Sequence, residues 1–301
     1  MTQPVQAGIP LVNRSVTVTV GSTQVTNIGQ QVGLDVWAHV RRSLRPQEPN
    51  TADLRLYNLS DASRKAIEAA AQPIPGPAQP GGTNTVTPVK IVAGYVGNTS
   101  TLFLGEMRSA QTMTDGPDTV TELTTGDGDN AAIIARMSQG FSKGANAYAV
   151  ARALLTAMGL GSGNIDSVAA VLKASPLYAN GVVVKGNAMA VLKDLCASVA
   201  LEVSVQGGVA QFLSLGQPLD GQAYVLSSDT GMVGTPSVDT KGVLTVATLL
   251  LPGLRPGSPV QMAAKYVQGL YRVISIESSI DTAGNDFQHM LECRKYNTGL
   301  G

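Results

Sequence analysis

Alternation of apolar and polar residues is the main pattern in the first 128 residues. In residues 16–20 (Val-Thr-Val-Thr-Val), every second side chain is apolar, as in a strand with one buried face. A helix is expected over residues 61–71, because Ser60 stands where an N-cap belongs. Strands are predicted over residues 16–20, 33–41, 50–56, 89–95, 101–105 and 118–124. Residues 10–128 therefore predict one β-barrel with a single outlying helix.

The spacing of apolar residues changes to that of helices after Asp129. Helices are predicted over residues 131–137 and 145–158, with Gly159 in the position that usually ends a helix. Asn187 is expected to cap a further helix, and Gly207-Gly208 to form the turn of a hairpin. These elements predict a small α+β module over residues 129–216.

The last part of the chain returns to strands. Apolar or alternating stretches separated by Pro, Gly and Asp predict strands over residues 243–251, 258–262, 271–280 and 287–293. We interpret residues 217–301 as a second antiparallel β-barrel, which could be a divergent copy of the first. The predicted fold is therefore mainly β, with an α+β insertion and domains at 1–128, 129–216 and 217–301.

Two stretches are expected to be irregular. Residues 72–84 are rich in Pro and Gly and would form either a flexible surface loop or an interaction arm. Residues 41–46 (Arg-Arg-Ser-Leu-Arg-Pro) form a basic corner, which is more typical of a solvated loop than of a binding site.

Charge is sparse along the whole chain. Charged residues make up 14% of the sequence and cancel to a net charge of zero, whereas about 25% is usual. Lys and Arg number nine in residues 1–130, six in 131–216 and six in 217–301, against eleven, three and seven Asp and Glu. No segment is basic enough for a nucleic-acid patch. Low charge suggests that partners cover much of the surface.

Other segments bear on cellular context. Cys196 and Cys293 lack metal or redox spacing and fit buried thiols in a reducing compartment. The first ten residues do not resemble a signal peptide, and no stretch approaches the ~18 apolar residues of a membrane span. We therefore expect a soluble protein made in a cytoplasm, without membrane insertion.

The search for chemistry gives weak candidates. Residues 159–164 are glycine-rich but follow a helix, unlike a phosphate-binding loop, which follows a strand. His289 lies on the apolar face of a predicted strand, and His39 shares a polar face with Trp37 and Asp35, which indicates a surface that a partner covers.

Carboxylates and metal ligands give no better candidate. Asp127 and Asp129 lie in a Gly-rich turn, where Asp commonly bonds to the local backbone. Metal-binding spacings are absent from the sequence. We therefore predict no catalytic, cofactor-binding or metal-binding residue and no cofactor.

Four segments carry a resemblance to a known family. In chain order they are residues 50–64 with their Tyr-Asn-Leu-Ser, residues 93–128, residues 186–212, and residues 249–260 (Leu-Leu-Leu-Pro-Gly-Leu-Arg-Pro-Gly-Ser-Pro-Val) with Tyr271-Arg-Val. This is also the order in which the family has them. They resemble phage tail baseplate hub proteins of contractile-tailed phages, which are related to the hub part of type VI secretion spikes. The resemblance covers nearly the whole chain.

The resemblance implies a structural role. A homotrimer with two tail-tube-like barrels per chain would form a ring that joins the hexameric tail tube to the central spike and lines the DNA channel. Its partners would be itself, the tube or tube-initiator protein, the spike and the wedge proteins, with DNA only as passing cargo. The protein would belong to the virion, at the tail baseplate, after assembly in the host cytoplasm.

Two alternatives stay open, a tail-associated cell-wall hydrolase and a receptor- or carbohydrate-binding tail protein. The sequence shows no acid–base or metal constellation for the first and few aromatic residues for the second. We expect no appended lysozyme, peptidase or spike domain, so cell-wall digestion would belong to another chain. In a hub, Lys143, Arg152, Lys173 and Lys193 of the middle module should lie outside a neutral or slightly acidic channel.

Overall fold

The computed structural model describes residues 13–28, 33–45, 48–71, 87–127, 135–174, 180–219 and 221–296. This part of the chain is mainly β, as predicted. Its residues fall into two compact units. The first takes the described part of 1–74, 86–126 and 217–301, and the second takes that of 127–216. The first unit thus holds both predicted β regions, and the second holds the predicted α+β module. The three-domain division stays a prediction.

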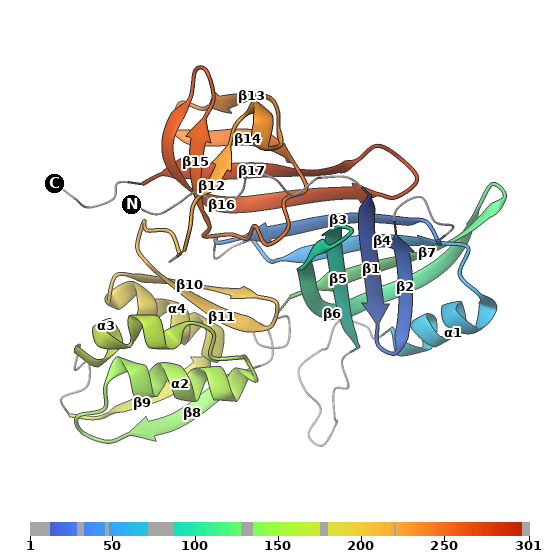
Figure 1. The fold of residues 1–301 in the computed structure, drawn as a ribbon. Helices are drawn as coiled ribbons and strands as arrows, with labels where there is room; N and C mark the ends of the chain where they lie inside the picture. Colours follow the sequence, from blue (N-terminus) through green and yellow to red (C-terminus); the bar gives the residue numbers. More distant parts are fainter. Residues whose placement is uncertain are drawn as a thin grey trace. The chain divides into compact units, whose positions relative to one another are not determined.

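A single 13-stranded sheet forms the first unit (Figure 1). The strands are β1 (Arg14–Val20), β2 (Thr23–Ile28), β3 (Val36–Ser43), β4 (Thr51–Tyr57), β5 (Pro88–Tyr95), β6 (Asn98–Asp115), β7 (Asp118–Gly126), β12 (Tyr224–Leu226), β13 (Met232–Val238), β14 (Val243–Leu249), β15 (Pro259–Ala263), β16 (Gln268–Asp281) and β17 (Phe287–Lys295). Their order is β13-β14-β17-β16-β3-β4-β7-β6-β5-β1-β2, and β15 lies beside β16 and carries β12. Helix α1 (Asp61–Ala70) follows β4, and the hydroxyl of Ser60 accepts a bond from the Ser63 amide, as expected of an N-cap.

The junction between the N-terminal and C-terminal strands is the pair β3 and β16. Their antiparallel register runs from Ser43 opposite Ser275 to Trp37 opposite Asp281. Two separate barrels were predicted, whereas the described strands form one open sheet that crosses this junction, and no barrel closes among them. The sequence could not show the junction, because its two strands lie more than 200 residues apart and each reads as an ordinary alternating strand.

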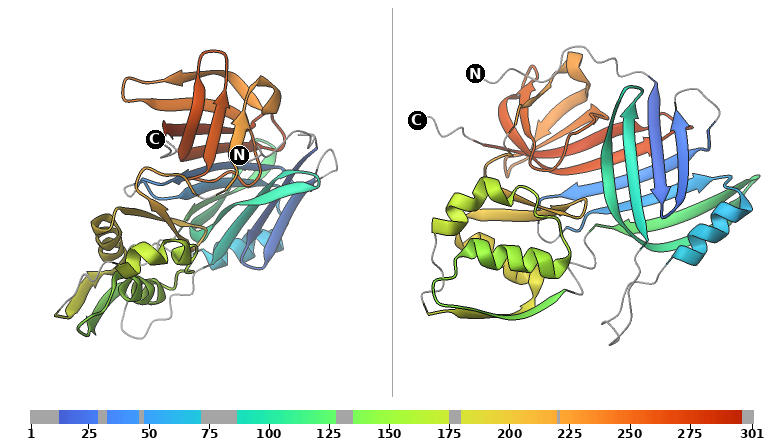
Figure 2. Two further views of the ribbon diagram at one scale, coloured as in Figure 1. Left: turned by 60° about the vertical axis from the view of Figure 1, so that its left-hand side comes forward. Right: turned by 60° about the horizontal axis from the view of Figure 1, so that its bottom comes forward.

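The strands on the two sides of the junction follow the same order. In the N-terminal half (β1–β7) it is β3-β4-β7-β6-β5-β1, and in the C-terminal half (β12–β17) it is β13-β14-β17-β16-β15-β12. Figure 2 shows both halves from two further directions. The last position differs, because β1 is antiparallel to β5 whereas β12 is parallel to β15.

Equivalent strands also agree in detail. β4 and β14 each have seven residues, and β7 and β17 each have nine. β5 begins at Pro88 and β15 at Pro259, where the missing N–H of proline is tolerated. The hairpins β6–β7 and β16–β17 each contain one register shift, next to Ser109 and Ser275. The two halves are therefore built on one plan.

Each half has its own hydrophobic core. Leu54, Leu123 and Ile67 of α1 belong to the N-terminal core, and Leu244 and Leu291 to the C-terminal one. The end of the β16–β17 hairpin belongs to the N-terminal core, to which it contributes Ile280 and Phe287. This hairpin therefore spans both cores and holds the junction in place.

The second unit is a separate α+β module. Its elements are β8 (Arg136–Phe141), α2 (Ala147–Met158), η2 (Ile165–Val168), α3 (Ala169–Ala174), β9 (Val182–Asn187), α4 (Ala188–Ser198), β10 (Leu201–Gln206) and β11 (Val209–Ser214). β8 pairs with β9, and β10 with β11, around a core that includes Leu154, Leu192 and Phe212. Gly159 is left-handed after α2, and Asn187 caps α4, as predicted.

Some expected elements differ from the structure. Residues 136 and 137 were predicted as the end of a helix but belong to β8. The segment Ala-Ala-Ile-Ile-Ala-Arg-Met is almost uniformly apolar, so its pattern cannot distinguish the helical spacing of apolar residues from the alternation of a strand. Residues 136 and 137 form a strand because they pair with β9. Residues 131–134 and the predicted loop 72–84 lie outside the described residues. The short strands β2, β9, β12 and β13 were not predicted. Among the described helices, none is long and apolar enough to cross a membrane.

Candidate interface on the outer face of the sheet

The side chains that point away from both cores form a continuous polar surface at the junction. Alternation along each strand places them there, because neighbouring side chains in a strand point to opposite sides. We call this surface the outer face and define it by Trp37, His39, Arg41, Asp53, Arg55, Glu122, Thr245, Ser275, Glu277, Ser279, Asp281, Met290, Glu292 and Arg294. It combines five neighbouring strands with part of a sixth.

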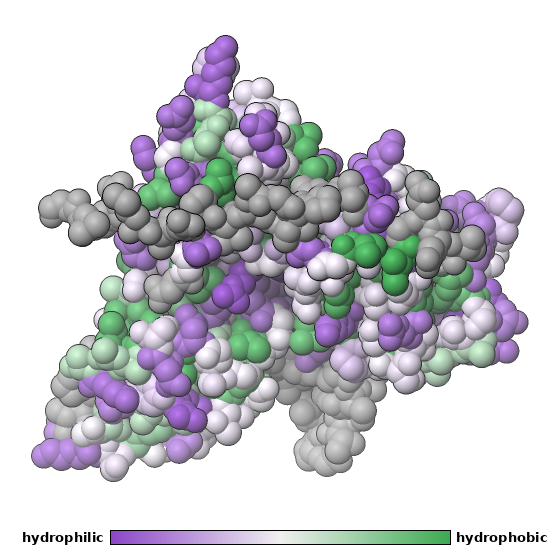
Figure 3. All heavy atoms as spheres, in the orientation of Figure 1, coloured by the Kyte–Doolittle hydropathy of each residue, from purple (hydrophilic) through white to green (hydrophobic). Residues whose placement is uncertain are grey.

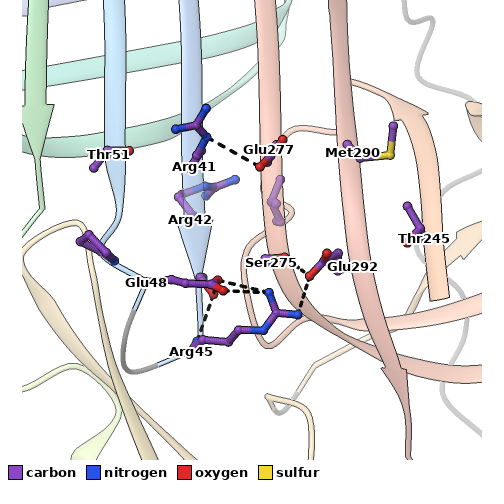
Figure 4. Close-up of a pocket in the computed structure, with 13 residues that line it drawn as sticks. Arg41, Arg42, Arg45, Glu48, Thr51, Thr245, Ser275, Glu277, Met290 and Glu292 are labelled. Carbon is purple, nitrogen blue, oxygen red and sulfur yellow. Dashed lines mark hydrogen bonds and ion pairs between the residues drawn. The ribbon is translucent and has the colours of Figure 1, made fainter. Parts of the chain in front are cut away.

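A hollow of about 550 Å³ lies at one end of the outer face (Figure 4). It is bounded by β3, β16 and β17 and by the chain after β3, which brings Arg45 and Glu48 over it. Arg45 lies between two carboxylates, at 3.0 Å from Glu48 and 2.5 Å from Glu292. Of the basic corner that was predicted as a solvated loop, Arg41, Arg42, Ser43 and Arg45 line the hollow, and the first three belong to β3.

Hydroxyl groups complete this ion-pair network. Ser43 donates to Glu48 over 2.7 Å, and Ser275 donates to Glu292 over 2.9 Å. Burial alone would lower the pKa of Arg45, but the hydrogen bonds that Arg45 donates to Glu292 and Glu48 and the negative charges of these carboxylates outweigh it, so the pKa is raised. Both glutamates pair with Arg45 and thereby join the loop to β17.

One ion pair crosses the junction itself. Arg41 on β3 lies 3.7 Å from Glu277 on β16, and both side chains are more than half exposed. Water and salt screen such pairs, so this one contributes little to stability. The pair places a positive charge of β3 beside a negative charge of β16 across the junction.

Trp37 is the aromatic centre of the other end of the outer face. The guanidinium carbon of Arg55 lies 5.0 Å from the centre of the indole ring, and Arg55 also donates to Glu122 over 2.8 Å. The His39 ring stacks on Trp37 at 6.4 Å between ring centres. Trp and Arg are the residues that most often dominate binding energy at protein interfaces. Trp37 and His39 of the predicted polar face thus belong to a larger surface that points away from both cores.

The outer face with its loop carries more negative than positive charge. Its arginines are Arg41, Arg45, Arg55 and Arg294, which follows Glu292 on the outward side of β17, and its carboxylates are Glu48, Asp53, Glu122, Glu277, Asp281 and Glu292. Such a surface does not attract the phosphates of a nucleic acid.

His289 lies on the opposite side of the sheet, inside the C-terminal half. It is fully buried, and its Nδ1 lies 2.8 Å from the Ser278 hydroxyl. Burial lowers the pKa of His289 to about 3, and the positive charge of Arg42 acts in the same direction. Arg42 is itself buried and donates to the Leu254 carbonyl. His289 is therefore a neutral core residue without access to a substrate.

The glycine-rich residues 159–164 pack against β11. Asn164 both donates to and accepts from the backbone of Phe212, each over 2.7 Å. A Cβ added to Gly163 would lie only 1.8 Å from the Ala210 carbonyl oxygen. The loop is filled by the module's own backbone, so it has no room for a phosphate.

The remaining candidate side chains have structural partners. The Asp127 carboxylate accepts hydrogen bonds from the amides of Gly207 and Gly208 at 2.6 and 2.9 Å, in a turn that is distant in sequence. Asp129 lies outside the described residues. Cys196 and Cys293 are buried free thiols, and burial raises the pKa of each to about 12. In the part of the chain that the structure describes, no group of three or more His, Cys, Asp or Glu side chains could hold a metal ion.

The basic residues of the module include two that surround an aromatic ring. Lys173 lies 4.7 Å and Arg152 5.9 Å from the centre of the Tyr148 ring. Burial lowers the pKa of Lys193. Lys143 is exposed.

Residues 14–293 match a family model described as baseplate hub gp41. The chain belongs to this family. The match covers nearly the whole chain and confirms the resemblance to phage baseplate hub proteins. No curated protein matches the sequence.

Two solved phage tail proteins and a solved type VI secretion component share the fold of this chain. The 43 kDa tail protein of prophage MuSo2 from Shewanella oneidensis is 10% identical with a TM-score of 0.61, over 94% of this chain and 97% of that one. A tail protein from Neisseria meningitidis is 8% identical with a TM-score of 0.61, over 94% and 96%. The E. coli c3393 protein, a component of the type VI secretion system, is 10% identical with a TM-score of 0.56, over 93% and 77%. These identities are low, so the likeness shows the fold.

The outer face was only partly predictable. Trp37 and His39 were found from their alternation with apolar residues on one strand. The partners Glu292 and Glu277 were missed, since they lie on strands more than 200 residues away. The signal for each is its place between residues that face the core, Glu277 in β16 and Glu292 in β17, which marks an outward side chain but names no partner.

Proposed function

We propose that this chain is the subunit of a homotrimeric hub ring at the base of a phage tail. Each chain contributes two barrel-like halves, so three chains bring six. The ring joins the hexameric tail tube to the threefold central spike and surrounds the path of the DNA. This is the symmetry-adaptor role implied by the resemblance to baseplate hubs.

The repeated strand order is the observation that carries the proposal. A chain with two halves of one plan can offer similar surfaces twice, so a threefold ring offers them six times. The separate cores of the halves support the same view, because each half can keep its shape while its surface adapts. The open ends of the sheet are where two barrels would close or join.

We assign the outer face to the channel. Its six carboxylates outnumber its four arginines. A lumen that neutralised phosphates would hold DNA by releasing its counterions, whereas a slightly acidic one lets it slide. The more basic module, with Lys143, Arg152, Lys173 and Lys193, then lies outside the channel.

The proposed partners are the tube or tube-initiator protein on one side and the central spike on the other, with wedge proteins around the ring. Low charge fits a surface that is largely covered, and Figure 3 shows hydrophobic and hydrophilic residues interspersed over one face. The chain assembles in the host cytoplasm and remains in the virion. It acts without a cofactor and without catalysis, because the carboxylates of the hollow are engaged by Arg41 and Arg45.

The mass of the native particle tests the proposal. Mass photometry or native mass spectrometry, with and without neighbouring tail proteins, should give a species of three 31.1 kDa chains. A chain that remains monomeric in the assembled tail would overturn it. So would a trimer structure in which Lys143, Arg152, Lys173 and Lys193 point into the channel.

Enzymatic activity is tested separately. Purified protein should not clear a peptidoglycan substrate. Clearing that is abolished by Glu277→Gln or Glu292→Gln, but not by Thr245→Ala in the same hollow, would establish the hydrolase alternative instead.

A further inference from the structure

The repeated plan leaves one strand without the neighbour that its equivalent has. The register shifts align Ser109 of β6 with Ser275 of β16, and both strands then run six further residues, to Asp115 and Asp281. Residues 275–281 lie between β17 and β3. Of the described strands, only β7 pairs with residues 109–115.

The difference in pairing appears in the exposure of these residues. Residues 276, 278 and 280 are buried in the paired strand, and among 275–281 only Glu277 is exposed. In the equivalent stretch 109–115 no residue is buried, and five are exposed. Among the described residues, the side of β6 that faces away from β7 is therefore an open edge over 109–115.

β13, the strand equivalent to β3, also lacks one of the two neighbours that its equivalent has. β3 pairs with β4 and β16, whereas β13 pairs with β14 alone among the described strands. Backbone hydrogen bonds join Leu249 to Gly231 and Asp239 to Val243, and they fix which residues of β13 bond to β14 and which do not. They direct the backbone groups of Val238 away from β14, toward the open side.

We propose that β6 of one copy pairs antiparallel with β13 of the next copy and thereby repeats the β3–β16 junction between subunits. This inference rests on the proposed ring and names its subunit contact. Each copy has one edge of each kind, so the contact is head to tail and closes by rotation. Around the ring, junctions within one chain would then alternate with junctions between two chains.

The internal junction predicts the register of the proposed one. Since His39 pairs with Ser279, the equivalent residues place Met113 opposite Ser237 of the partner subunit. Thr112 then lies opposite Val238 of the partner subunit, and Gln111 opposite Asp239 of the partner subunit. No like charges meet in these pairs.

Exposed apolar side chains coincide with the two edges. Met113 is 39% exposed and Val238 48%. Two of the large hydrophobic residues that the described surface leaves exposed would thus be covered by this contact. Open apolar edges otherwise promote aggregation.

The contact is shorter than the internal junction. The Met232 amide already donates to the Ser227 carbonyl, and β13 bulges between Val233 and Ser237 around Pro236, which has no N–H. Pairing therefore centres on residues 237–239. The bulge also protects β13 from unregulated pairing.

A disulfide tests the register directly. In the double variant Met113→Cys with Ser237→Cys, the facing Cα atoms should lie about 4.5 Å apart, which a disulfide can bridge. Mild oxidation of the full-length protein, alone and with neighbouring tail proteins, should give covalent species of two and three chains. Each single variant should remain at one chain, since the native Cys196 and Cys293 are buried.

The other open edge supplies the matched control. β2 ends the sheet at the far side, and Gln24 is exposed on it. The double variant Gln24→Cys with Ser237→Cys should not cross-link. Cross-linking of this pair in place of the first would show that β2 meets β13 and would overturn the inference.

A proline variant tests the backbone contact. Thr119 exchanges bonds with Asn58, so the backbone groups of the facing Thr114 point to the open edge. Thr114→Pro removes an edge donor and should shift the particle toward single chains, whereas Thr114→Ala keeps the donor and should retain the trimer. Proline in β6 can also destabilise the hairpin, and the disulfide test does not depend on it.

The outcomes separate the two proposals. A trimer without the Met113–Ser237 cross-link overturns this contact and leaves the hub ring standing. A chain that stays monomeric with its neighbouring tail proteins overturns both.

Discussion

Replacing His289 with Asn should remove a specific part of the protein's acid sensitivity. The folded protein holds His289 neutral, because burial lowers its pKa from 6.5 to about 3. The unfolded chain binds a proton there near pH 6.5. As pH falls from 6.5 toward 3, the unfolded state therefore gains protons that the folded state does not, and stability is lost.

The magnitude follows from these two pKa values. Each pH unit between them changes the free energy of unfolding by about 1.4 kcal/mol. Between about pH 7.5 and pH 5, the histidine should cost the wild-type protein roughly 2 kcal/mol. Carboxylates that titrate in the same range act in both proteins and cancel in the comparison.

Urea unfolding at several pH values measures the effect. Asn keeps a polar atom near Nδ1 for the Ser278 hydroxyl, and its cavity costs the same at every pH. The stability gap between wild type and His289→Asn should therefore narrow by roughly 2 kcal/mol on acidification. His39→Asn, on the outer face, is the control: this variant should still lose the stability that His289 costs the wild-type protein on acidification. A gap that does not change with pH would refute the assignment of His289 as a buried neutral residue.

Three further predictions concern the sheet and the module. Leu54→Ala in the N-terminal core should cost about 2–5 kcal/mol in urea unfolding, whereas Leu215→Ala, at a side chain that is 64% exposed, should cost less than about 0.5 kcal/mol; equal costs would contradict the core assignment. A double-mutant cycle on Arg41 and Glu277 should give a coupling below about 1 kcal/mol that weakens with salt, and a larger value would mean that the pair is buried in the particle measured. Asp127→Ala should leave the amides of Gly207 and Gly208 without their acceptor and destabilise the module by about 1–3 kcal/mol. Hydrogen exchange at this turn should become faster. Asp166→Ala is the control for loss of a carboxylate elsewhere in the module.

The sequence predicted those elements whose pattern is set locally. β4 was found because Ala52, Leu54 and Leu56 alternate over one core, and α1 because Ser60 caps it. The turn at Gly207 and Gly208 was found because both glycines must adopt positive φ, which they do at 65° and 72°. These features depend on neighbours within a few residues.

The features that join distant strands could not be predicted in this way. β3 would show the same alternation beside any neighbour, so its pairing with β16 left no trace in residues 36–43. The hollow has the same cause, because Arg45 and Glu292 meet only once β3, β16 and β17 are in register.

The internal repeat is hidden for a different reason. Equivalent positions of the two halves hold unlike residues, such as Thr121 and His289, or Leu56 and Thr248. Strand order and register persist in both halves, whereas the side chains have adapted to two different cores. A common plan can therefore be read from hydrogen bonding where side chains no longer show it.

The edges of the sheet connect this plan to assembly. A charge-poor chain with open edges on β6 and β13 should aggregate, because unpaired backbone and apolar side chains such as Met113 and Val238 template further pairing. Within one chain, the β3–β16 junction already covers the equivalent pair of edges. The remaining pair is complementary by the same geometry, so the proposed ring of copies would leave neither edge exposed. On this reasoning, the junction that makes one sheet of two halves is also the template for joining one subunit to the next.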